Sequence, residues 1–95
     1  MLLGNINTQL VFEKIKNQEI YKDDRFHILL CMKEGEFLKP HHSPTDAFLL
    51  MIKGEILFML DDKEFHLTEG DEFTFKAKET HSVKAVTNAA FLLIK

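Results

Sequence analysis

The chain has 95 residues, of which 45% are hydrophobic and 28% charged, and this length has room for a single hydrophobic core. Its 12 Lys and Arg residues are scattered and outnumbered by 15 Asp and Glu residues, which argues against nucleic acid as a partner. The longest apolar runs are far below the roughly 20 residues of a membrane-spanning helix, and no secretory signal is expected, so we expect a cytoplasmic protein that binds no membrane.

The first 24 residues carry little pattern. Residues 10–12 (Leu-Val-Phe) and Ile15 are apolar, and they fit either a further strand or one short helical turn. We expect residues 1–24 to pack on the domain formed by residues 25–95 or on a partner copy of it.

From Arg25 onward, short runs rich in Phe, Ile, Leu and Val alternate with polar or glycine-bearing breaks, a spacing typical of sandwiches and barrels. Gly, Pro, Asp and Asn in the breaks supply turn chemistry. The sequence predicts an all-β domain without a helix after residue 24. Strands are expected over residues 25–32, 36–39, 47–52, 55–60, 63–67, 72–75, 82–86 and 90–94.

Side-chain alternation separates two kinds of strand. Residues 63–67 and 72–75 alternate between apolar and polar side chains, so each should have one face in water. Residues 47–52 are apolar at both parities, with Phe48, Leu50 and Ile52 on one side and the intervening residues on the other. Only one set can fill the interior, so we expect a homodimer to cover the other.

Three isolated reactive side chains have ordinary structural interpretations. Cys31 is the only cysteine and lies inside an apolar run, which indicates a buried, inert thiol. His66 occupies the polar parity of its strand and should lie on the surface. His27 opens an apolar strand and should have a structural role.

Two glycine-bounded segments carry the remaining histidines. Residues 35–54 contain a glycine, a histidine and a closing glycine, and residues 70–81 begin with Gly-Asp and end in a histidine. Together they resemble the paired motifs of the cupin superfamily over residues 25–95. This resemblance implies a cupin-like β-barrel of the jelly-roll kind, in which the two motifs converge. The matching positions are Gly35, His41, Gly54, Gly70, Asp71 and His81.

The departures from the cupin motifs concern the metal. Metal-dependent cupins hold a divalent ion such as iron, manganese, nickel or zinc with three histidines and a glutamate. Here Ser43 stands at the second histidine position and Ala47 at the glutamate position, so only His41 and His81 remain in register. Lys78 also replaces the usual glycine of the second motif.

Neighbouring residues fit the missing ligand positions only with altered register. Adjacent strand residues point to opposite faces, so His42 or Asp46 would need a bulge or a one-residue slip to join His41 and His81. The alternative of a metal-dependent dioxygenase, isomerase or decarboxylase rests on such a set.

The loss of two of the four metal-ligand positions favours a binding protein over an enzyme. We expect a small polar molecule in a pocket lined by His41, Ser43, Ala47 and His81, with any divalent metal held weakly. The sequence identifies neither the ligand nor a reaction.

Overall fold

The computed structural model describes all 95 residues, Met1–Lys95. No helix in it is long and apolar enough to span a membrane. The chain forms one short 3₁₀ helix and nine strands. They are η1 (Ile6–Gln9), β1 (Ile15–Lys22), β2 (Phe26–Met32), β3 (Phe37–His41), β4 (Ala47–Lys53), β5 (Ile56–Leu60), β6 (Lys63–Leu67), β7 (Glu72–Phe75), β8 (His81–Ala85) and β9 (Ala89–Ile94).

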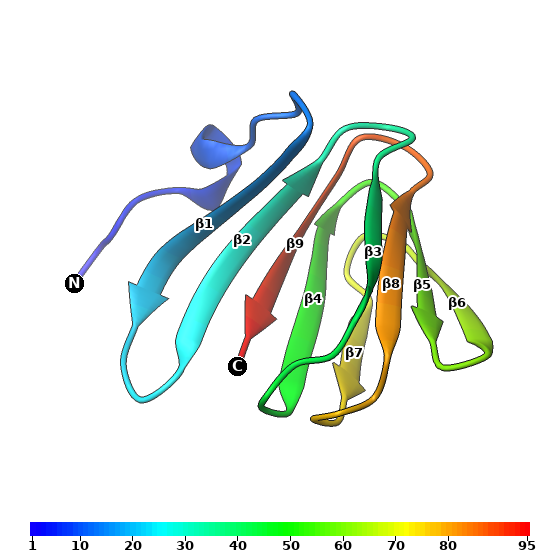
Figure 1. The fold of residues 1–95 in the computed structure, drawn as a ribbon. Helices are drawn as coiled ribbons and strands as arrows, with labels where there is room; N and C mark the ends of the chain where they lie inside the picture. Colours follow the sequence, from blue (N-terminus) through cyan, green and yellow to red (C-terminus); the bar gives the residue numbers. More distant parts are fainter.

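The strands form two antiparallel sheets that face each other (Figure 1). One sheet has the order β1-β2-β9-β4-β7, and the other has the order β3-β8-β5-β6. Hydrogen-bonded pairing occurs within each sheet, so the barrel is a two-sheet sandwich rather than one continuous cylinder. The all-β prediction is confirmed, and all eight predicted strands form within one or two residues of their expected bounds.

The core lies between the sheets and shows which parity of each strand faces inward. In β4, Leu49 and Met51 are fully buried between the sheets, whereas Phe48 and Leu50 lie on the outer face and are half-buried. Phe58 of β5 enters the same core from the opposite sheet. Each such buried side chain contributes about 1.5–3 kcal/mol relative to an exposed one, so this interior holds the sheets together.

The N-terminal segment forms both a helical turn and a strand, although the apolar residues 10–12 lie in neither of them. The turn is η1, which ends at Gln9, and the strand β1 begins only at Ile15. β1 is largely polar because it is an edge strand, and its pairing with β2 along its whole length stabilises it through backbone hydrogen bonds.

The segment before β1 covers part of the outer face of the five-stranded sheet. Leu10 and Phe12 pack there against Leu29 and Cys31, both of which are 1% exposed. The predicted burial of Cys31 is thus confirmed, although the covering residues come from its own N-terminal segment rather than from the core between the sheets.

Gly54 and Lys78, turn residues of the two cupin-like motifs, have a left-handed backbone conformation. Gly54, between β4 and β5, has a φ of +75°, and a Cβ there would overlap the carbonyl oxygen of Asn88. Lys78, between β7 and β8, has a φ of +73°. The left-handed turn of the second motif therefore persists although its glycine is replaced.

Candidate ligand-binding site

The structure brings His41 and His81 together as cross-strand neighbours. They pair directly across β3 and β8, and their ring centroids lie 4.2 Å apart at an interplanar angle of 62°. The β3–β8 register shifts between Leu38 and His41, where Pro40 has no amide hydrogen to donate to the ladder. This irregularity precedes His41 immediately and sets its position against His81.

His81 lies in an aromatic surrounding. It is 6% exposed, its ring stacks on Phe58 at 5.7 Å and it contacts Phe75 at a centroid distance of 4.5 Å. Burial lowers the pKa of His81 below its ordinary value of 6.5, the hydrogen bond to the Glu79 carbonyl opposes this, and the charges of nearby groups, including Lys95, lower it further. At neutral pH this imidazole is therefore uncharged.

The backbone fixes the tautomer of both rings. Nδ1 of His41 lies 2.7 Å from the carbonyl oxygen of Lys39, and Nδ1 of His81 lies 3.2 Å from that of Glu79. A carbonyl oxygen only accepts hydrogen bonds, so each Nδ1 is the donor. In the neutral rings Nε2 is then the free acceptor on both histidines.

The interior next to this histidine pair is almost filled. A cavity of about 30 Å³ remains, which is the share of liquid volume of about one water molecule. His41 itself is exposed, so the pair spans from solvent to the core. Seven of the nine residues that line the cavity are hydrophobic: Leu30, Leu38, Phe58, Phe75, Val83, Phe91 and Leu93, with His41 and His81 completing the wall.

Ser43 and Ala47 are not among the residues that line this cavity. Ser43 is 5% exposed, and its Oγ accepts a hydrogen bond of 3.4 Å from the amide of Thr45. Ala47 is 4% exposed and pairs with Phe75 across β4 and β7, within the core. Both predicted pocket residues are thus buried, Ser43 in the loop that precedes β4 and Ala47 beside Phe75, which lines the cavity.

The two candidate substitute ligands do not complete a metal-binding group with His41 and His81. His42 is exposed beyond the end of β3. The carboxylate of Asp46 accepts a 2.8 Å hydrogen bond from the amide of Ala77, which is the main cause of its lowered pKa, and it pairs with Lys76 at 3.6 Å. No three His, Cys, Asp or Glu residues form a group that could hold a metal ion. The residues present therefore do not fit a complete metal centre.

The other two histidines lie far from this arrangement. His66 is exposed and its Nε2 lies 3.1 Å from a carboxylate oxygen of Glu55. His27 packs edge-on against Tyr21 at 5.3 Å, and its Nδ1 lies 3.9 Å from Asp23. These positions agree with the surface and structural roles expected of them.

A protein-family model described as the cupin domain matches residues 28–95, which is most of the chain and includes both glycine-histidine segments. This chain belongs to the cupin domain family. No curated protein matches its sequence.

Solved structures show the same fold as this cupin. A conserved protein of unknown function from Streptococcus pyogenes superposes with a TM-score of 0.87 at 19% identity, covering 98% of this chain and 84% of that one. A cupin-2 domain protein from Shewanella frigidimarina gives a TM-score of 0.84 at 15% identity, covering 98% and 93%. At these identities the likeness establishes the fold alone.

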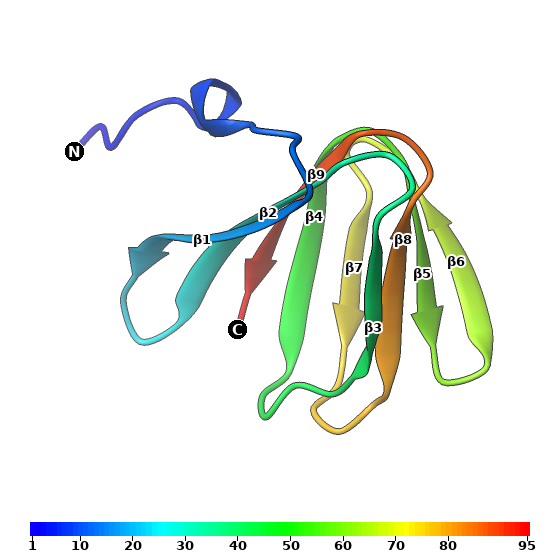
Figure 2. The same ribbon diagram turned by 45° about the horizontal axis from the view of Figure 1, so that its top comes forward.

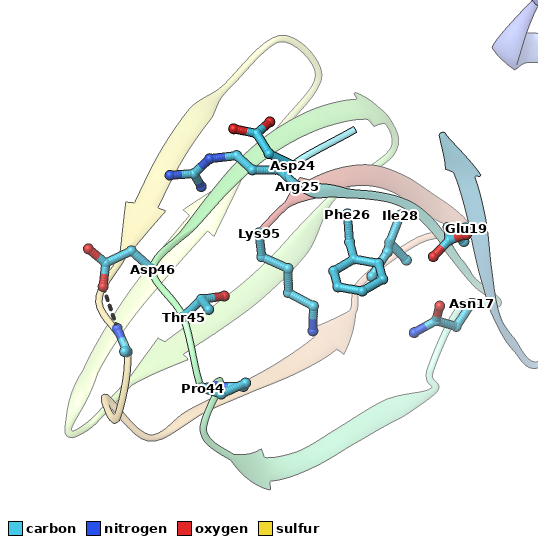
Figure 3. A pocket seen from close by; sticks show the side chains of 11 residues that line it. Asn17, Glu19, Asp24, Arg25, Phe26, Ile28, Pro44, Thr45, Asp46 and Lys95 are labelled. Carbon is cyan, nitrogen blue, oxygen red and sulfur yellow. Dashed lines mark hydrogen bonds between the residues drawn. The ribbon is translucent and has the colours of Figure 1, made fainter. Parts of the chain in front are cut away.

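This cupin also has a second, larger cavity that the sequence did not indicate. It is open to solvent, has a volume of about 820 Å³ and lies beneath the β1–β2 hairpin (Figure 3). Its lining comes from β1, β2 and the turn between them, the loop before β4, Ala77 and the last residue, Lys95. Only the tertiary fold brings these segments together.

Proposed function

We propose that this cupin binds a small polar molecule at the mouth of its barrel, through the Nε2 atoms of His41 and His81. The observation that supports this proposal is the shared tautomer of the two adjacent rings, since both Nδ1 atoms are bonded to backbone carbonyls. Two Nε2 acceptors side by side suit a ligand that carries hydroxyl or amine donors.

The size of the interior limits how such a ligand binds. With about 30 Å³ free beside the histidines, only one small donor group enters, and the rest of the molecule stays at the exposed side of His41. The Phe58 and Phe75 rings exclude water around His81, and hydrogen bonds are stronger in such a surrounding. The buried histidine therefore supplies most of the binding free energy, and His41 orients the ligand.

A divalent transition metal is the alternative occupant of the same pair. Two imidazoles leave the remaining coordination positions to water or to the ligand itself, so iron, manganese, nickel or zinc would be held weakly. Because Asp46 is bonded to Ala77 and Lys76 instead, nothing in the structure favours the dioxygenase, isomerase or decarboxylase alternative. We assign no reaction.

Side-chain ¹⁵N–¹H spectra of histidine-labelled protein test this proposal. Glycerol, xylose and ethanolamine are added in turn, and at least one should shift the Nε2 signals of His41 and His81 while leaving those of His66 unchanged. If none of the three shifts either signal, or if His66 moves equally, the proposed site is wrong.

Elemental analysis of untagged protein tests the metal alternative. We expect less than one equivalent of metal per chain after dialysis. A full equivalent that is lost in His81→Asn but kept in His66→Asn would show a metal centre and would contradict a metal-free binding site.

A further inference from the structure

The 820 Å³ cavity exists because one sheet extends past the other. In Figure 2, β1 and β2 continue beyond β3, the nearest strand of the second sheet, so the inner face of this hairpin has no strand in front of it. The cavity shares no lining residue with the small cavity at His41 and His81. It is therefore a separate candidate site, independent of the function proposed above.

The floor of the cavity is apolar. Phe26 and Ile28 of β2 point into it (Figure 3), and Phe26 is 44% exposed although it is a large hydrophobic residue. Covering this surface would be favourable, since each Å² of apolar area removed from water contributes about 25 cal/mol. A ligand for this cavity should thus carry an apolar group.

Opposite charges line the two sides of this floor. Glu19 and Asn17 of β1 stand on one side, and the Lys95 side chain runs across from the end of β9 (Figure 3). Glu19 and Lys95 line the same cavity, but they form no ion pair with each other or with any other residue. Each charge is thus available to a ligand.

The remaining charged residues of the cavity lie at its margin. Asp46 is turned toward the amide of Ala77, and the carboxylate of Asp24 and the guanidinium of Arg25 extend away from Phe26 (Figure 3). The charged groups of the cavity lining that face the apolar floor are therefore the Lys95 ammonium and the Glu19 carboxylate, and the Lys22 ammonium lies outside the lining, 5.1 Å from the centroid of the Phe26 ring. Lys95 and Glu19 together would neutralise a ligand of two opposite charges.

We propose that this cavity binds a small zwitterion with an aliphatic side chain, of the chemical class of an apolar amino acid. Its carboxylate pairs with Lys95, its ammonium pairs with Glu19 and the oxygen of Asn17, and its side chain covers Phe26 and Ile28. Charge-assisted hydrogen bonds are roughly twice as strong as neutral ones. A ligand with a single charge would leave the other protein charge without a partner.

Titration of ¹⁵N-labelled protein with three matched probes tests the proposal. Leucine carries both charges, 4-methylpentanoate has only the carboxylate, and 3-methylbutylamine has only the ammonium. We expect leucine to shift the amide signals of residues lining the cavity, with a Kd at least about tenfold lower than that of either analogue, which corresponds to one charged contact. Equal affinities, or no binding of leucine, would overturn the proposal.

Two variants test which protein side chain binds which charged group of leucine. Glu19→Gln should bind leucine no more tightly than 4-methylpentanoate, and Lys95→Met should bind leucine no more tightly than 3-methylbutylamine. Neither side chain is buried in the core, so both variants should keep the wild-type spectrum elsewhere. Lys84→Met, which changes an exposed lysine of β8 outside the cavity, is the matched control and should keep the full preference for leucine. A preference that survives both cavity variants would contradict the assignment.

Discussion

At the scale of single residues, His81 couples the stability of the fold to pH. Its aromatic surrounding lowers its pKa below 6.5, so the unfolded chain takes up a proton at a higher pH than the folded chain does. The stability contributed by the neutral, buried ring is present above about pH 6.5 and is lost as the pH falls through the lower folded-state pKa. The charged or titratable groups that affect this ring are His41, His42 and Lys95.

We expect the free energy of unfolding to fall between pH 7 and pH 5 more steeply in the wild-type protein than in His81→Phe. The variant keeps an aromatic ring against Phe58 and Phe75 but has no group to protonate. Urea unfolding at pH 5, 6, 7 and 8 measures both curves, in a range above the ordinary titration of carboxylates. Parallel curves for the two proteins would show that His81 is not the source of the pH dependence.

Lys78 has a left-handed backbone conformation that residues with a side chain rarely adopt. A residue with a side chain at φ +73° is strained by about 1–2 kcal/mol relative to the right-handed region. Glycine removes this strain, but its greater backbone freedom stabilises the unfolded state by about 0.5–1 kcal/mol. Lys78→Gly should therefore stabilise the protein by about 0.5–1 kcal/mol in urea unfolding. The neighbouring change Lys76→Gly, at a residue without positive φ, should destabilise it. Destabilisation by Lys78→Gly would contradict the strain argument.

At the scale of elements, the hairpins depend on two kinds of glycine. Gly54 and Gly70 both have positive φ, but a Cβ at Gly54 would overlap Asn88, whereas one at Gly70 has no atom within 4 Å. The turn between β4 and β5 thus needs glycine for both conformation and space, because the chain between β8 and β9 passes directly over it.

Alanine substitutions separate these two requirements. Gly70→Ala should cost about 1 kcal/mol of unfolding free energy, from strain alone. Gly54→Ala should cost about 3 kcal/mol or more, because an overpacking penalty adds to the strain. Thermal and urea unfolding of both variants measure the difference. Equal losses would mean that the β8–β9 turn moves aside freely.

At the scale of the whole molecule, the outer face of the five-stranded sheet is only partly covered by the chain itself. The N-terminal segment packs over Leu29, Cys31 and Ala90, and Ile52 packs on the same cluster. Phe48 and Leu50 of β4, with Leu92 and Ile94 paired to them on β9, stay half-exposed on the same face. This apolar stripe contains Phe48 and Leu50 of the set expected from the sequence, and the fold adds Leu92 and Ile94 to it.

The homodimer remains a prediction, and we place it on the stripe of Phe48, Leu50, Leu92 and Ile94. A second copy related by a two-fold axis would cover it with the same residues. Light scattering at micromolar concentration should give twice the 11.1 kDa chain mass, and Leu50→Asp should give a folded monomer. The matched change Lys84→Asp, at an exposed position of β8 in the four-stranded sheet, should keep the dimer. A monomeric wild-type protein would show that the N-terminal segment is sufficient cover.

The sequence by itself determined the strands, their turns and the cupin family, because alternating side chains and turn residues act over a few positions. It also predicted that His41 and His81 converge, since both lie in register with the family motifs. Three features were decided by tertiary contacts between segments distant in the chain. The polar strand β1 forms only through pairing with β2, and Ser43 and Ala47 are buried outside the lining of the histidine cavity. The open cavity exists only because the β1–β2 hairpin extends past the opposite sheet, which places Glu19 and Lys95 around Phe26.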